Sequence, residues 1–453
     1  MKTLGIDTLL LLIGGILPLM VVHGWVTPTS NHLPLSSTGR RCRSISPLRH
    51  PTRVGQPQTC PPTIPTPSTT STSRTAPLNM MMDMTVAQAS LAATAKLLSS
   101  IGLGGLAALK PNLLDAAAIS ALSRLTYWMF QPAFLFGSVS KTLYTAATTT
   151  SGGLSLRALW LLPALACGQI MAGAVLGRVL AKLYAVQGDA EIRNVRMCTT
   201  FGNSGPLPLI FADALFGSNA LLQSQMAAGI SFYLLAWSPL FWTLGKVILA
   251  SEDEETTAAT SDSKWAATKA TLTKIMSPPV IGSLAGLVVG LVPWLRNLFF
   301  GPTALLRPLY GALHTLGTAY LPAALLVLAG SLVGKRAATD DKDTTAAPTM
   351  RGMAAIATYR FLVSPLLTLG AAAWLQTLTW MDARTKAIVV FLCLMEGCMP
   401  PAQNSVILLQ LANRPGPAAA MAKLLTILYT AAVLPVTILL TACLQQSGIL
   451  AYL

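Results

Sequence analysis

The sequence predicts an all-α polytopic membrane protein with ten transmembrane helices, arranged as two inverted five-helix repeats with broken helices 4 and 9. Three observations predict this fold. Hydrophobic residues make up 53% and charged residues 10% of the chain, whereas a soluble domain carries about 25% charged residues. Ten apolar segments follow one another after Asp83, each close to the ~20 residues that a membrane-spanning helix needs. Proline interrupts both the fourth and the ninth of these segments.

The first 82 residues differ in composition from the rest of the chain. Residues 1–24 have the charged start and apolar centre of a signal peptide. Residues 25–82 are rich in Ser, Thr, Pro and Arg, and the chain has no acidic residue between Asp7 and Asp83. We expect this second segment to be a disordered, transit-like leader. Trp25 after the signal peptide resembles the bipartite leader of algae with secondary plastids, which favours a plastid membrane. The alternative is the endoplasmic reticulum membrane with a disordered lumenal tail.

The ten expected spans divide into two sets of five. They are Ala87–Ala108, Ile119–Val139, Ala158–Leu180, Val195–Phe216, Met226–Leu249, Pro279–Leu295, Leu313–Val333, Ala354–Leu375, Ala387–Leu411 and Ala418–Leu444. The first repeat covers residues 87–249, a polar loop covers 250–276, and the second repeat covers 277–453. Because each repeat has an odd number of spans, the second repeat enters the membrane from the opposite side.

Sequence similarity between the halves supports this division. Pro132-Ala133 in the second span matches Pro322-Ala323 in the seventh, and a Gly-Ser pair follows in both. Lysine and arginine are more frequent in the loops on one side of the predicted membrane, which predicts that this side is cytoplasmic or stromal.

The two interruptions lie where a membrane helix is expected. Residues 201–209 read Phe-Gly-Asn-Ser-Gly-Pro-Leu-Pro-Leu, and residues 399–404 read Met-Pro-Pro-Ala-Gln-Asn. Proline removes a backbone donor and clashes with the preceding turn, so both helices should break. A broken backbone in lipid is tolerated only where protein or a water-filled cavity receives its free polar groups. Two broken helices at matching places predict a transporter binding site, and kinked helices with a packing role are the alternative.

The same residues carry a resemblance to a known family. Residues 202–209 resemble the Gly-Asn-x-Gly-Asn-Leu-Pro-Leu motif of the auxin efflux carrier superfamily, and residues 399–404 look like the Pro-Pro-Ala-x-Asn of its PIN-LIKES branch. Residues 277–296 and 321–323 are similar to the sixth and seventh spans of that branch. The resemblance implies ten helices in inverted repeats, with a scaffold part and a mobile transport part. It also implies an organic-anion substrate, with indole-3-acetic acid as the familiar case and small dicarboxylates for bacterial relatives.

We expect the residues of both breaks to bind the substrate. They are Asn203, Ser204, Gly205, Pro206, Pro208, Pro400, Pro401, Gln403 and Asn404. The half-helices that start after each break present free N–H groups and a partial positive charge to an anion, and the amide side chains add donors. Interhelical packing is the alternative role for each amide taken alone. Pro206 stands where the family usually has a second Asn, which removes a side-chain amide and a backbone donor.

Glu396 stands one turn before Pro400 inside a predicted span. A carboxylate in a membrane is a functional candidate by default, and this one is our candidate for proton coupling. A partnership with Arg360, or a position near the membrane surface, is the alternative. We expect Asp213 to lie near the membrane surface or to be paired, and His314 to be structural.

These observations together predict a secondary transporter that moves a small organic anion, such as an auxin-like carboxylate, by alternating access. A dicarboxylate-type metabolite carrier and a channel-like uniporter on the same fold are the alternatives. The substrate, the coupling ion, the direction of transport and a possible homodimer stay open.

Other classes fit the sequence poorly. The chain lacks the His-Glu-x-x-His motif of intramembrane metalloproteases, and His314 is the only histidine outside the leader, so we expect no enzyme. The seven cysteines match no metal-ligand spacing, and we expect neither a metal nor a cofactor. The net charge of +15 lies in the leader and in loops rather than on an aromatic-rich stripe, so we expect a lipid membrane and no nucleic acid as partner.

Overall fold

The computed structural model describes residues 113–148, 155–249, 276–301, 303–333 and 348–452, together with 102–108 and positions 88, 91, 92, 95 and 99. All of these residues belong to the second of two units, Pro77–Leu453. The predicted signal peptide and transit-like leader lie outside the described residues. Most of the predicted polar loop, residues 250–275, and nearly half of the first predicted span lie outside them as well.

The described part of the first half is helical. Its helices are α3 (Ala116–Leu125), α4 (Gln131–Thr148), α5 (Leu156–Leu159), α6 (Leu161–Leu183), α7 (Asp189–Thr200), α8 (Pro206–Phe216) and α9 (Ala220–Leu249). A π-helical turn, Thr126–Phe130, connects α3 directly to α4. The two helices therefore form one continuous helical segment that includes the predicted second span.

The second half repeats this pattern of long and broken helices. Its helices are α12 (Pro278–Leu291), α13 (Pro293–Phe299), α14 (Arg307–Thr318), α15 (Tyr320–Val333), α16 (Met350–Thr358), α17 (Ser364–Thr377), α18 (Ala383–Gly397), α19 (Asn404–Leu411) and α20 (Pro415–Ser447). Another π-helical turn, Tyr359–Val363, connects α16 to α17.

The structure confirms an all-helical polytopic membrane protein in its described part. Five helical segments there are long and apolar enough to span a membrane, or six if α12 and α13 count as one bent span. The five are Arg157–Leu183, Ala220–Leu249, Arg307–Leu332, Met350–Thr377 and Pro415–Ser447. The predicted fourth and ninth spans are not among them, because each is divided into two short helices. The count of ten and the inverted repeats therefore stay predictions.

The sixth predicted span differs from the expected straight helix. Its two parts, α12 and α13, meet at an angle of 104°. Pro293 is the first residue of α13, and Val292 before it has extended backbone angles (φ −84°, ψ 112°). Proline disfavours the helical conformation in the residue that precedes it, which explains the position of the bend.

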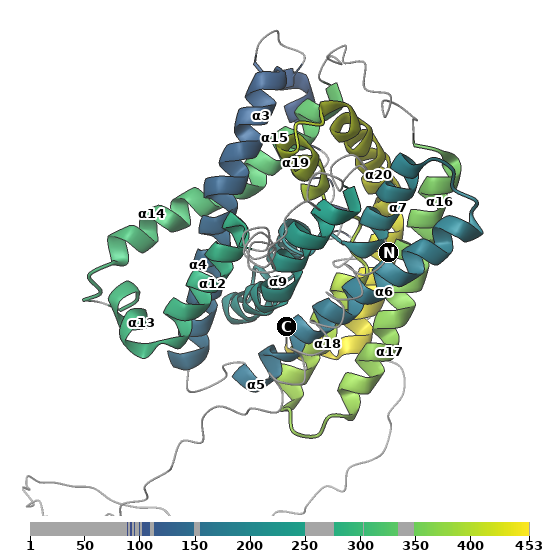
Figure 1. The fold of residues 1–453 in the computed structure, drawn as a ribbon. Helices are drawn as coiled ribbons and strands as arrows, with labels where there is room; N and C mark the ends of the chain where they lie inside the picture. The colour runs from purple at the N-terminus through teal and green to yellow at the C-terminus, as the bar shows by residue number, and fades with distance from the viewer. Residues whose placement is uncertain are drawn as a thin grey trace, which may run out of the picture. The chain divides into compact units, whose positions relative to one another are not determined.

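One group of helices contains α3, α4, α12, α14 and α15, and within it α4 packs closely along α12 (Figure 1). Glycines four residues apart make this approach possible. A Cβ atom on Gly286 would lie 2.8 Å from the carbonyl oxygen of Phe136, and Gly282 likewise faces the backbone of Pro132. Small residues at this spacing are typical of helix contacts in membranes.

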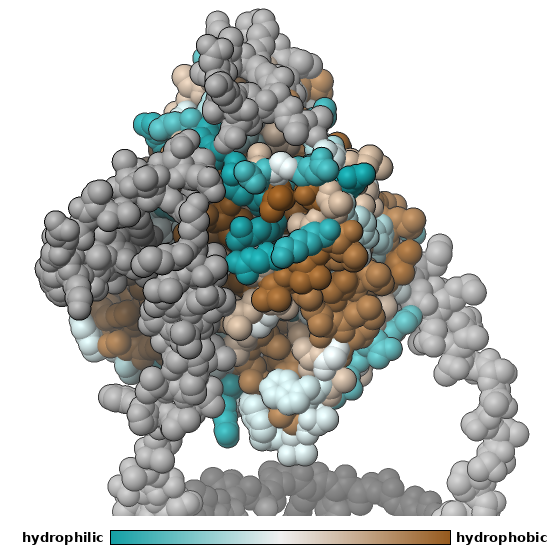
Figure 2. Space-filling model, turned by 45° about the vertical axis from the view of Figure 1, so that its right-hand side comes forward, coloured by the Kyte–Doolittle hydropathy of each residue, from teal (hydrophilic) through white to brown (hydrophobic). Residues whose placement is uncertain are grey.

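A second group contains α6, α7, α16, α17, α18 and α20, and α9 contacts helices of both groups (Figure 1). Large apolar side chains remain exposed on α6, α17 and α20, among them Val179, Leu366 and Leu434. Figure 2 shows a broad hydrophobic area bordered by hydrophilic side chains on one face. Lipid is the environment that such a surface requires.

Candidate functional site

The two predicted breaks cross each other in the centre of the described helices. Gly202, between α7 and α8, forms an antiparallel β-bridge with Pro401, between α18 and α19. The backbone N–H of Asn203 donates to the carbonyl oxygen of Pro400 (2.7 Å), and the N–H of Ala402 donates to that of Phe201 (3.0 Å). Backbone groups that lose their helical partners at one break therefore form hydrogen bonds with backbone groups of the other break.

Proline explains where α8 begins after the first break. Pro206 is the first residue of α8, and Gly205 is its N-cap. The first positions of a helix tolerate proline, because their N–H groups have no partner within the helix. Pro206 and Pro208 nevertheless leave the amino end of α8 with two fewer N–H groups than an ordinary helix presents. This end is therefore a poorer anion donor than the sequence motif alone implies.

Two tyrosines that the sequence did not single out hold the crossing in place. The Asn203 Nδ2 amide donates to the Tyr429 hydroxyl (3.0 Å), which itself donates to the carbonyl oxygen of Pro401 (2.7 Å). The Asn404 Nδ2 amide donates to the Tyr320 hydroxyl (2.7 Å). Tyr429 lies on α20 and Tyr320 begins α15. Each asparagine thus anchors a break to a helix outside its own span.

All nine predicted site residues are buried, and they lie at the two breaks. Several polar atoms among them have no hydrogen-bond partner within the described part of the chain. They are both amide atoms of Gln403 and the Oδ1 atom of Asn404. An unsatisfied buried polar atom costs about 1–3 kcal/mol, so these atoms are available to a ligand.

Glu396 is 2% exposed, and neither of its carboxylate oxygens has a hydrogen-bond partner among the described residues. Ser204 and Tyr233 are polar neighbours of this carboxylate. The Tyr233 hydroxyl donates instead to Gln169 Oε1 (2.6 Å). Glu396 therefore lies buried beside the crossing.

Arg360 is not the partner of Glu396, so that alternative is wrong. Its Nε donates to the carbonyl oxygen of Cys198 (2.7 Å) and its Nη2 to that of Thr199 (3.0 Å), at the carboxyl end of α7. The side chain is 4% exposed, and a Cβ on Gly202 would lie 3.0 Å from its Nη1 atom. A guanidinium thus sits directly beside the crossing and offsets the negative end of α7.

Only one weak signal in the sequence indicates this role of Arg360. An arginine inside an apolar span is costly and marks function, but the carbonyl groups that it binds lie about 160 residues away in the chain, at positions 198 and 199. The π-helical turn that contains Arg360 is a feature often found at functional sites.

A pocket of about 260 Å³ adjoins the crossing. It lies between α4 and α14 on one side and α8 on the other, and Phe134, Pro206, Asp213, His314 and Tyr320 are among its lining residues. The rings of Phe134 and Tyr320 stack with centroids 5.2 Å apart. Sequence reasoning treated Asp213 and His314 as residues outside the site, yet both line this pocket.

The pocket touches the first broken span directly and the second through one intermediate residue. Pro206 belongs to the first break, and the Tyr320 hydroxyl accepts the hydrogen bond from Asn404 of the second. Its volume is close to the lower end of the range for small-molecule sites, which is about 300–1,000 Å³.

These features define a class: a polytopic helical membrane protein in which two interrupted spans cross at a buried polar site beside a pocket. The chain belongs to the membrane transport protein family, whose model matches residues 89–440. Within it, the chain is a member of the PIN-LIKES branch of the auxin efflux carrier superfamily. The predicted resemblance is thereby confirmed, and the chain is a membrane transporter of this family.

Three relatives from Arabidopsis thaliana illustrate the similarity. The chain is 22% identical to Protein PIN-LIKES 5 over 349 residues, which cover 67% of this chain and 84% of the relative. It is 24% identical to Protein PIN-LIKES 1 over 351 residues, covering 68% of this chain and 70% of the relative. It is 33% identical to Protein PIN-LIKES 2 over a shorter stretch of 96 residues, which covers 21% of this chain and 20% of the relative.

Proposed function

We propose that this transporter carries a small organic anion, and that the anion binds where the two interrupted spans cross. The observation that carries the proposal is the pocket between α4, α14 and α8. Its wall includes Pro206 of the first break and the tyrosine that holds Asn404 of the second. A ligand in this pocket would contact the first break directly and the second through Tyr320.

The charge distribution near the crossing suits an anion. Arg360 supplies a buried positive charge beside Gly202, and Gln403 supplies an amide without a protein partner in the described residues. The proline-rich start of α8 supplies fewer N–H donors. We therefore assign the carboxylate of the substrate to the α19 side of the crossing, next to Asn404.

The pocket wall favours an aromatic monocarboxylate over the dicarboxylate alternative. Phe134 and Tyr320 offer aromatic faces for a ring. Asp213 lies on the same wall, where its carboxylate accepts a hydrogen bond from Gln223 (2.7 Å). A second carboxylate on the substrate would be repelled there by the like charge.

Alternating access follows if the helix groups on either side of the pocket move relative to each other. α4, α12 and α14 would serve as the scaffold part. The broken helices, with α6, α16 and α20, would serve as the mobile part. The inverted repeats that we predict would make the inward- and outward-facing forms similar in energy.

Counterflow in proteoliposomes tests this function. Vesicles preloaded with indole-3-acetate, benzoate, malate or pyruvate are diluted into a trace of the same labelled acid. We expect saturable accumulation with indole-3-acetate or benzoate and little with malate. Flux that never saturates and shows no counterflow would instead identify a channel. Accumulation with malate alone would identify the dicarboxylate alternative.

Glu396 is our candidate for coupling transport to a proton, because it is buried beside the crossing without a hydrogen-bond partner among the described residues. Glu396→Gln keeps the shape of the side chain but cannot exchange a proton. We expect this variant to lose the pH dependence of uptake while it still binds the substrate. An unchanged pH dependence would remove Glu396 from this role and assign the pH dependence to another group.

We further propose a plastid membrane as the location, on the composition of residues 1–82. A fusion of these residues to a fluorescent protein tests this, with the endoplasmic reticulum as the competing destination. Mass photometry of the purified chain distinguishes a monomer from the homodimer that the sequence leaves open.

A further inference from the structure

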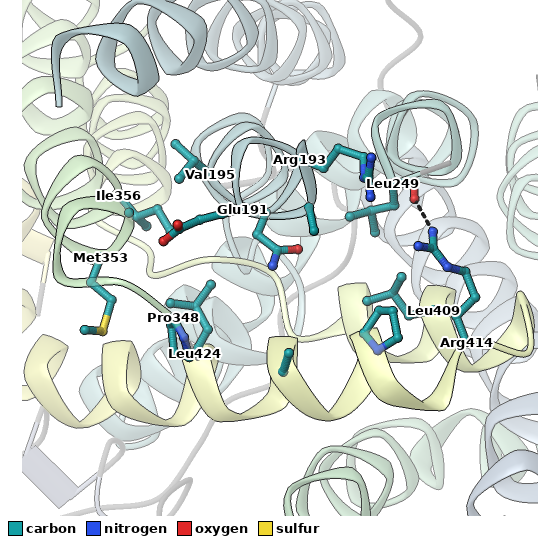
Figure 3. A pocket seen from close by; sticks show the side chains of 15 residues that line it. Glu191, Arg193, Val195, Leu249, Pro348, Met353, Ile356, Leu409, Arg414 and Leu424 are labelled. Carbon is teal, nitrogen blue, oxygen red and sulfur yellow. Dashed lines mark hydrogen bonds between the residues drawn. The ribbon is translucent and has the colours of Figure 1, made fainter. Parts of the chain in front are cut away.

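A second pocket lies apart from the crossing, where three helices begin. It is lined by residues of the first two turns of α7 and α16 and the first three turns of α20, with Leu409 of α19 and Leu249 at the end of α9 (Figure 3). It shares no lining residue with the pocket beside Pro206. Its volume is about 50 Å³, which is room for about four water molecules at the minimum cavity size that holds one. A tetrahedral anion with four oxygens has a similar size.

Two arginines from different helices come together at one end of this pocket. Arg193 projects from α7, and Arg414 precedes α20. Both reach toward Leu249 (Figure 3). The Arg414 Nη1 atom donates to the carbonyl oxygen of Leu249 (2.7 Å), which fixes its guanidinium at the pocket. Arginine is the side chain best suited to phosphate, because its planar fork matches two phosphate oxygens.

The third charged residue of the lining, Glu191, is bound to the start of α16. Glu191 accepts hydrogen bonds from the backbone N–H of Thr349 (2.9 Å) and from its hydroxyl group. Thr349 is the N-cap of α16, so this carboxylate is bound at the positive end of that helix. The pocket thus already contains one bound anionic group, the Glu191 carboxylate. The guanidinium groups of Arg193 and Arg414 line the other end of the pocket.

The remaining wall is apolar. Met353, Ile356 and Leu424 line the side away from the arginines, and Leu409 lies beside Arg414 (Figure 3). Cationic groups beside an apolar wall, between helices at the end of a membrane domain, suit the phosphate of a lipid headgroup. The cationic end alone would also accept a free phosphate.

We propose that this pocket is a regulatory site for a phosphate group, bound by Arg193 and Arg414. The site is independent of the substrate, because it lies at the opposite end of α7 from the crossing. Arg193 is seven residues before Thr200, the last residue of α7, so the two places are about 10 Å apart along the helix. A phosphate here would tie α7 to α20, which carries Tyr429 and so contacts the first break. Occupancy should therefore change the rate of transport rather than the choice of substrate.

Binding to the full-length purified protein tests the proposal without any transport assay. One arm measures retention of phosphatidic acid against phosphatidylcholine in nanodiscs by native mass spectrometry. The other arm measures thermal stabilisation by inorganic phosphate. The variants are Arg193→Gln, Arg193→Gln/Arg414→Gln, and Arg296→Gln/Arg307→Gln as a matched control outside both pockets. Arg193→Gln keeps the bond between Arg414 and α9, so it remains informative if the double variant does not fold.

A basic residue near a membrane surface strengthens binding of an anionic headgroup about fivefold. We therefore expect Arg193→Gln to weaken phosphatidic acid binding about fivefold and the double variant about thirtyfold, with the control unchanged. If inorganic phosphate stabilises the wild type in this arginine-dependent way and the lipid is not retained, the ligand is a free phosphate. If neither probe distinguishes the wild type from the Arg193 variants, or if the control loses as much, the proposal is overturned.

Discussion

Replacing Arg360 by glutamine is the sharpest perturbation that the structure offers at the crossing. The substitution removes one positive charge and the two hydrogen bonds to the carboxyl end of α7. At about 8 Å from a bound carboxylate and an effective dielectric constant of about 20, that charge is worth about 2 kcal/mol. We therefore expect Arg360→Gln to bind indole-3-acetate about thirtyfold more weakly.

The assay separates this charge effect from damage to the fold. Isothermal titration compares indole-3-acetate with indole-3-acetamide, which has the same ring and no charge. Arg360→Gln should weaken binding of the acid and leave that of the amide nearly unchanged. Arg360→Lys should restore most of the preference for the acid. If both ligands weaken equally, Arg360 only supports the fold, and if neither weakens, the electrostatic account of the site is refuted.

Two further substitutions probe how the helices are held together. Tyr429→Phe leaves the buried Asn203 amide without its acceptor, so thermal unfolding should show a loss of about 1–3 kcal/mol, whereas Tyr144→Phe should change little. An unchanged melting temperature would argue against the tyrosine bridge. Gly286→Val places a side chain against the backbone of α4 and should destabilise the protein by about 1–3 kcal/mol. Gly311→Ala is its control, since a Cβ there meets nothing within 4 Å, and equal effects of the two would contradict this packing.

The two breaks were predictable from the sequence. Proline and glycine act on the local backbone, whatever packs around them. Residues 201–209 and 399–404 therefore predict a helix break from the sequence alone. The bend between α12 and α13 shows the limit of this reasoning. Pro293 was visible inside the sixth predicted span, but whether a proline kinks a helix slightly or turns it by 104° depends on what packs around it.

The partners of the crossing were not predictable in the same way. Tyr320 and Tyr429 read as ordinary members of apolar spans, and nothing local distinguishes a tyrosine that binds an asparagine on another helix. Arg360 stood out as a charge in a membrane segment, but the nearest candidate partner by charge was Glu396. In the structure Arg360 donates to backbone carbonyl groups instead. Every residue has such a group, so no sequence pattern marks them.

The most direct test of the central claim is equilibrium binding of indole-3-acetate to the purified protein with one asparagine of each break replaced. Asn203→Ala and Asn404→Ala each remove an amide that joins a break to a tyrosine. We expect each variant to bind about tenfold more weakly, in line with the loss of about 1.4 kcal/mol of hydrogen bonding. Undiminished affinity in both variants, with the wild type binding the acid, would show that the substrate lies elsewhere.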